Sequence, residues 1–129
     1  MSLIYIGPIY DRQKELAEKA LTIHNTCLKL AKPGNLVEDI DLAVFAEMKR
    51  LGVEDLAIHR SGHSIEINVQ KIPSIPVPEK TVLEPGMCFV VEPGIYDFRY
   101  GGFRIEDDIV ITKDGFEYLS NCERGIIVR

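Results

Sequence analysis

The chain has 129 residues, of which 46% are hydrophobic and 27% are charged, and its formal net charge is -5. This length suits one domain with one core, so we expect residues 1–129 to form a single domain. The negative charge gives no reason to expect nucleic acid or a membrane surface as a partner, and no apolar run approaches the roughly 20 residues that span a bilayer.

The cysteine content indicates a reducing compartment. Cys27, Cys88 and Cys122 are odd in number and lack the spacing of a metal motif. Such cysteines are typical of free thiols in the cytosol. Because the N-terminus also shows no secretion signal, we expect a cytoplasmic protein.

The first half of the chain predicts a short strand followed by two helices. A strand-like run covers residues 4–9, and Asp11 follows as a plausible helix N-cap. From Asp11 to Lys32 apolar residues recur at three- and four-residue steps, which predicts a helix of about 20 residues with one buried face. His24 lies on or beside that face and is expected to be a packing residue.

A second amphipathic helix is predicted from about Leu36 to Leu51, after the helix-ending Pro33-Gly34. The apolar residues assigned to it are Val37, Ile40, Ala43, Val44, Phe45, Ala46 and Met48.

The second half of the chain predicts strands. Apolar, β-branched or alternating runs occupy residues 56–59, 65–69, 87–91, 103–112, 116–119 and 126–128. The run 103–112 is the longest, and Lys113-Asp114-Gly115 after it is a hairpin signal. Prolines interrupt the segment 73–85, which we interpret as an extended loop. Two helices followed by an antiparallel sheet give an α+β fold.

Two glutamates stand out because they lie beside these apolar runs. Side chains alternate between the faces of a strand, so Glu92 and Glu106 on neighbouring strands could point into one cleft. A buried carboxylate must be paired, hydrogen-bonded or metal-bound. With the upstream His59 and His63, the pattern is compatible with a divalent metal site. The alternative is that Glu106 and the two aspartates after it lie in an exposed hairpin and pair with Arg104.

Three motifs resemble the C-terminal half of the catalytic domain of the pita-bread metallopeptidases. They are His59-Arg60-Ser61-Gly62-His63, the run Leu83-Glu84-Pro85-Gly86-Met87 continued by Glu92-Pro93-Gly94-Ile95-Tyr96, and Gly102-Phe103-Arg104-Ile105-Glu106-Asp107. Aminopeptidase P and prolidase, the Xaa-Pro dipeptidase, are the members that the chain resembles most. The similarity covers nearly the whole chain and implies half of a pita-bread fold.

The resemblance implies roles for several residues. His63, Glu92 and Glu106 match metal ligands, and Glu92 also matches the carboxylate that handles the proton. His59 matches a substrate-side histidine, and Arg104 a residue that orients the site. The implied cofactor is a divalent metal of the Mn, Co or Zn class, and the implied substrates are short peptides with proline second.

Two departures from the family pattern affect the implied activity. The family's dinuclear site also needs two aspartates that precede the first helix, and no aspartate of this chain stands in that context. Gln70 occupies the position of the catalytic histidine, and an amide cannot cycle a proton near neutral pH. In addition, Lys71 replaces an acid, and Ser64 and Glu66 replace glycines.

Two hypotheses fit the motifs and the departures. The chain is either a fragment of a prolidase-like hydrolase that lacks its N-terminal half, or a pita-bread binding module with a decayed metal site. In both cases we expect the isolated chain to be inactive and to bind metal weakly or not at all. A half sheet has exposed edges, so we also expect self-association.

Overall fold

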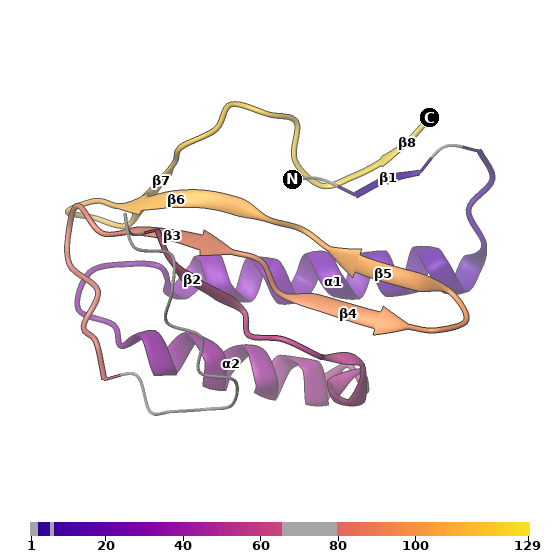
Figure 1. The fold of residues 1–129 in the computed structure, drawn as a ribbon, viewed down its shortest axis with the longest axis horizontal. Coiled ribbons are helices and arrows are strands. Elements are labelled where there is room, and N and C mark those ends of the chain that lie inside the picture. The colour runs from indigo at the N-terminus through magenta and orange to yellow at the C-terminus, as the bar shows by residue number, and fades with distance from the viewer. Residues whose placement is uncertain (1–2, 6, 66–79) are drawn as a thin grey trace.

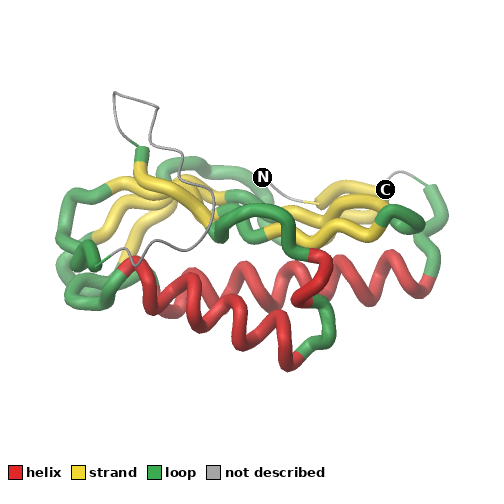
Figure 2. Tube along the Cα trace, turned by 60° about the horizontal axis from the view of Figure 1, so that its bottom comes forward, coloured by secondary structure: helices red, strands yellow, loops and turns green. Residues whose placement is uncertain are grey.

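The computed structural model describes residues 3–5, 7–65 and 80–129, which form two layers. Two helices lie side by side on one face of the strands, as Figure 1 and Figure 2 show. The arrangement confirms the predicted α+β class. Within the described residues, neither helix combines the length and the apolarity that a membrane span requires.

Both predicted helices are present. α1 covers Asp11–Leu30 and α2 covers Val37–Arg50. The N-cap of α1 is Tyr10, whose backbone N–H donates to Gln13 Oε1 at 3.2 Å, so the prediction of Asp11 as the cap was wrong by one residue. Asp11 instead begins the first turn, where a carboxylate interacts favourably with the helix dipole.

The apolar face of α1 is buried as predicted, but that of α2 is narrower than predicted. On α2 only Val44 and Met48 are fully buried, and Phe45 is 57% exposed. Residues four apart lie on the same side of a helix, whereas Phe45 is rotated by about 100° from Val44. The assignment of Phe45 to the buried face was therefore wrong.

The strand predicted at residues 56–59 is also absent from the structure. A 3₁₀ turn, η1, covers Glu54–Leu56 instead. The buried Val53 anchors this turn, and the Leu56 N–H donates to the Val53 carbonyl at 3.0 Å. A short apolar run cannot distinguish a strand from such a turn by its pattern alone.

Among the residues that the structure describes, the strands form three small sheets. The largest has the order β2-β3-β6-β7, with β2 at Gly62–Ser64, β3 at Cys88–Val91, β6 at Asp107–Ile111 and β7 at Phe116–Tyr118. A hairpin of β4 (Gly94–Asp97) and β5 (Gly101–Arg104) forms the second sheet. β1 (Leu3–Tyr5) and β8 (Ile126–Val128) form the third and pair in parallel, a pairing that was not predicted from the sequence.

The long strand predicted at residues 103–112 is divided into β5 and β6, which belong to different sheets. Opposite the division, Pro93 separates β3 from β4. Proline has no N–H for a ladder hydrogen bond, so regular pairing stops there on both strands. β4, which begins directly after this proline, was not predicted.

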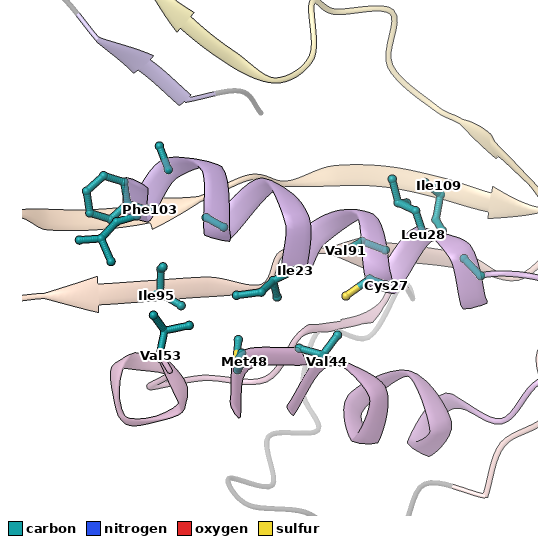
Figure 3. Packing of buried hydrophobic residues seen from close by; sticks show 14 of the residues in the cluster. Ile23, Cys27, Leu28, Val44, Met48, Val53, Val91, Ile95, Phe103 and Ile109 are labelled. Atoms are coloured by element: carbon teal, nitrogen blue, oxygen red, sulfur yellow. The ribbon is translucent and has the colours of Figure 1, made fainter. Parts of the chain in front are cut away.

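The core lies between the helices and the strands. Figure 3 shows Ile23 and Cys27 of α1 among side chains from the sheets, including Val91, Ile95 and Phe103. From Phe103 to Ile111 the side chains alternate between buried and half-buried. Of the buried set, Phe103, Ile109 and Ile111 belong to the core shared with the helices. The half-buried set, which begins with Arg104 and Glu106, lies on the opposite face of the strands.

Candidate metal and substrate site

Glu92 and Glu106 lie opposite each other where the four-stranded sheet passes into the β4–β5 hairpin. The last β3–β6 pair is Val91 with Asp107, and the first β4–β5 pair is Gly94 with Arg104. Each glutamate therefore occupies the short irregular link between two strands. This placement removes it from ladder pairing and leaves its carboxylate half-buried.

Arg104 joins the two glutamates. Its Nη1 lies 3.4 Å from Glu92 Oε2, and its Nη2 lies 3.3 Å from Glu106 Oε2. The carboxylates of Glu92 and Glu106, which the sequence predicted to lie close together, thus contact the same guanidinium. The ion pair between Arg104 and Glu106, which was part of the alternative interpretation, is also present. One arginine neutralises only one of the two carboxylate charges, so the pair retains a net negative charge that favours a cation.

His63 extends this group from the edge strand β2. Its Nε2 lies 3.6 Å from Glu92 Oε1, and its Nδ1 lies 3.0 Å from the Ser64 carbonyl oxygen. Because a carbonyl only accepts, Nδ1 donates here, and the tautomer that this contact selects has its lone pair at Nε2. Two electron-pair donors then lie 3.6 Å apart, a spacing compatible with two ligands of one ion at bond lengths of about 2.0–2.2 Å.

The donor set fits a divalent metal as part of a site. An imidazole and two carboxylates suit Mn, Co or Zn. However, among the residues that the structure describes, no group of three or more His, Cys, Asp or Glu side chains is arranged to hold an ion. His63, Glu92 and Glu106 are therefore a partial ligand set.

His59 lies in a second polar group with Tyr96, which sequence reasoning missed. His59 Nδ1 donates to the Arg60 carbonyl at 2.7 Å, so its Nε2 accepts from the Tyr96 hydroxyl at 2.7 Å. Glycines make room for Tyr96 on both sides: a Cβ on Gly94 would lie 2.8 Å from its oxygen, and one on Gly102 would lie 2.8 Å from its ring. An aromatic residue between glycines was the available sequence signal.

A third polar group is buried under the glutamates and was also missed. Asp107, 2% exposed, lies with its Oδ2 3.4 Å from His24 Nε2, while Arg124 Nε donates to Oδ1 at 3.0 Å. The exposed-hairpin alternative is therefore wrong for Asp107. His24 is buried as predicted, but beside a carboxylate. Burial lowers the pKa of His24, and Arg124 lowers it further, whereas Asp107 acts in the opposite direction.

Gln70, the remaining residue predicted at the catalytic centre, lies outside the described residues. Glu66 and Lys71 lie in the same segment. Ser64 is exposed on β2.

Fold and site together give a two-layer α+β arrangement with candidate metal ligands at the strand ends. The model of metallopeptidase family M24 matches residues 2–113. This match covers most of the chain, which belongs to metallopeptidase family M24.

Individual relatives are similar over nearly the whole chain. The Xaa-Pro dipeptidase of Lactobacillus helveticus is 39% identical over 120 residues, which are 93% of this chain and 33% of that protein. The prolidase structure from Pyrococcus horikoshii OT3 matches with a TM-score of 0.82 and 35% identity, covering 92% of this chain and 34% of that one. The Xaa-Pro dipeptidase structure from Bacillus anthracis matches with a TM-score of 0.86 and 32% identity, and the match covers 98% of this chain and 36% of that one.

These matches confirm half of a pita-bread fold. The chain spans about a third of the length of the relatives that it matches.

Proposed function

We propose that this chain is the C-terminal part of the catalytic domain of an Xaa-Pro dipeptidase, which hydrolyses the bond before proline in short peptides. The observation that carries the proposal is the continuous series His63–Glu92–Arg104–Glu106 at the strand junction of a family M24 fold. Its members come from three separate segments of the chain, at residues 63, 92 and 104–106, so their convergence is a property of the fold.

Each side chain has a role that follows from its position. His63 Nε2, Glu92 and Glu106 would hold a divalent metal, which when bound polarises a peptide carbonyl and lowers the pKa of a water molecule. Arg104 keeps the two carboxylates together. Glu92, which is within reach of both His63 and Arg104, would hold the transferred proton at its carboxylate.

His59 and Tyr96 belong to the substrate side of the proposed site. His59 accepts a hydrogen bond from the Tyr96 hydroxyl. The lone pairs of the phenol oxygen therefore remain available to a donor such as a peptide N–H. The 5.4 Å edge-to-face contact between the two rings holds this orientation.

We further propose that the chain is inactive by itself. A dinuclear centre needs more carboxylates than Glu92 and Glu106, and the family's two aspartates are not in this sequence. A cytoplasmic location is part of the proposal, since all three cysteines are free thiols.

A second candidate function is a peptide- or protein-binding module of the same fold. Gln70 favours it, because this residue stands where the family has a catalytic histidine. Loss of one donor to a tetrahedral intermediate typically costs about 10²- to 10³-fold in kcat. Binding geometry would survive that loss.

Kinetics of a longer form of the protein, containing the two aspartates, would test the proposal. With Mn²⁺ present, it should cleave Ala-Pro and leave Ala-Ala uncleaved, and the double variant Gln70→His, Lys71→Glu should raise kcat with a smaller change in KM. The variant Glu92→Gln should abolish turnover. Absence of turnover before and after the double substitution, with metal bound, would favour the binding module.

A further inference from the structure

Asp107 is a charged residue at a core-facing position of a strand. Along β6 and the link before it, the buried positions are Ile105, Asp107, Ile109 and Ile111. The Asp107 side chain is 1% exposed, so its charge requires a partner that reaches it inside the protein.

Arg124 is that partner. It comes from the segment between β7 and β8, in which residues 119–123 are all exposed and no secondary structure is present. Its guanidinium donates to Asp107, to the Cys122 carbonyl at 3.1 Å and to the Ser120 carbonyl, and it lies 3.6 Å above the Tyr118 ring. A single side chain thus fastens an otherwise exposed segment to the inside of the sheet.

Asp107 is also the residue directly after Glu106. Side chains alternate along the strand, so Asp107 faces the helices and Glu106 faces the opposite side, toward Arg104. Fixing the Asp107 carboxylate therefore fixes the point at which the chain enters β6, and with it the direction of the Glu106 side chain.

We propose that Arg124 is a positioning residue for the metal-ligand carboxylate of Glu106 and acts on it through Asp107. The inference rests on the proposed function for the role of Glu106, but the Arg124–Asp107–Glu106 linkage itself is independent of any bound ion.

His24 cannot replace Arg124 in this role. Its Nε2 is the other group near the Asp107 carboxylate, but at 3.4 Å neither atom has a hydrogen-bond partner within the described structure. Burial lowers the pKa of His24 and so disfavours a positive charge on its ring beside Asp107. Removal of Arg124 would leave the buried Asp107 carboxylate without its hydrogen-bond donor, and the strand entry would have to move to solvate it.

The test compares three variants of this chain. Arg124→Ala removes the anchor, and Arg124→Lys keeps the charge but loses the three-way guanidinium geometry. Arg129→Ala is the matched control, because Arg129 directly follows β8 and its side chain forms an exposed ion pair with Glu123 at 3.2 Å. Thermal unfolding, ¹⁵N NMR of the Arg104 guanidinium and Mn²⁺ affinity by EPR are measured for each.

We expect Arg124→Ala to shift the Arg104 signals and to weaken Mn²⁺ binding about 10- to 100-fold, the usual effect of losing a residue that orients a ligand. Arg124→Lys should shift the Arg104 signals less and weaken Mn²⁺ binding less than Arg124→Ala does. Arg129→Ala should match the unmodified chain in both measurements. If Arg124→Ala does not fold, the same measurements on Arg124→Lys are compared with those on Arg129→Ala and the unmodified chain.

The proposal is overturned if the Arg124 variants lower the melting temperature while the Arg104 signals stay unchanged, since Arg124 would then be only a structural clamp. Failure of the proposed function looks different. In that case the unmodified chain and a His63→Ala variant bind Mn²⁺ equally weakly, although Arg124→Ala still shifts the Arg104 signals.

Discussion

The polar side chains of this protein are oriented by their nearest backbone atoms and glycines. His59 is fixed in one tautomer because its Nδ1 donates to the adjacent Arg60 carbonyl, which leaves Nε2 for Tyr96. Gly94 permits that contact, since a Cβ there would lie 2.8 Å from the Tyr96 oxygen and 2.9 Å from His59 Nε2. A glycine in the motif Glu92-Pro93-Gly94 is therefore required by the two side chains that it accommodates.

Gly94→Ala should break the His59–Tyr96 hydrogen bond and destabilise the fold by about 1 kcal/mol, because the added methyl group displaces two flexible side chains. ¹⁵N NMR of His59 and thermal unfolding would measure the two effects. Gly115→Ala is the control, since nothing lies within 4 Å of the position of its Cβ. An unchanged His59 spectrum in Gly94→Ala would contradict this account.

His24 should make the stability of the protein depend on pH. Its folded-state pKa is lowered from 6.5, so below about pH 6.5 the unfolded chain binds a proton that the folded chain does not. Stability should then fall as the pH falls from 7.5 toward 5, with a slope of at most about 1.4 kcal/mol per pH unit. Denaturant unfolding of His24→Gln should show a smaller slope over that interval; an equal slope would contradict the prediction.

At the scale of the elements, β2 is held by the close approach of two backbones. A Cβ on Gly62 would lie 2.1 Å from the Val90 carbonyl oxygen, so no side chain can be accommodated while β2 and β3 stay paired. The adjacent hydrogen bonds, Ile65 N–H to Cys88 and Glu92 N–H to Ser61, depend on the same pairing. β2 therefore brings His63 to Glu92 only if residue 62 is glycine.

Gly62→Ala should detach β2 while the helices and the other strands remain folded. Hydrogen exchange followed by NMR should show lost protection at the Ile65 and Glu92 amides, with protection retained in α1 and β6. Ser64→Ala, on the same strand but with an exposed side chain, should leave exchange unchanged. Protection retained at both amides in Gly62→Ala would contradict the role assigned to the glycine.

The sequence predicted the elements whose pattern is repeated over many residues. The 20-residue α1 presents its apolar positions over several turns, so its face was predicted correctly. The division between β5 and β6 was missed because Ile105 and Glu106 look like strand residues, and the break is imposed by Pro93 on the opposite strand. A break caused by a neighbouring strand leaves no mark in the local sequence.

For the candidate site as well, the residues in sequence motifs were predictable and those brought together by packing were not. Motifs identified His59, His63, Glu92, Arg104 and Glu106 as candidate residues. Asp107 and its contacts could not be predicted, because His24 and Arg124 are far from it in the sequence and each is ordinary in its own surroundings. Only the packing of α1 and the last segment against β6 brings these three residues together.

At the scale of the whole molecule, β2 and β7 are the outer strands of the four-stranded sheet. Within the described residues, β2 and β7 are each paired on one side only. Unpaired strand edges offer hydrogen-bonding groups to another chain. We therefore expect this chain to self-associate at micromolar concentration. Sedimentation velocity would measure this, and a purely monomeric chain would count against it.

We propose that this molecule carries a partial metal site, with His63, Glu92 and Glu106 as three ligands of a centre that needs further carboxylates. Metal analysis after incubation with Mn²⁺ and exhaustive dialysis tests it most directly. We predict well under one equivalent per chain, together with a weak affinity by EPR that His63→Ala weakens further. Two tightly held ions per chain, retained through dialysis, would contradict the account.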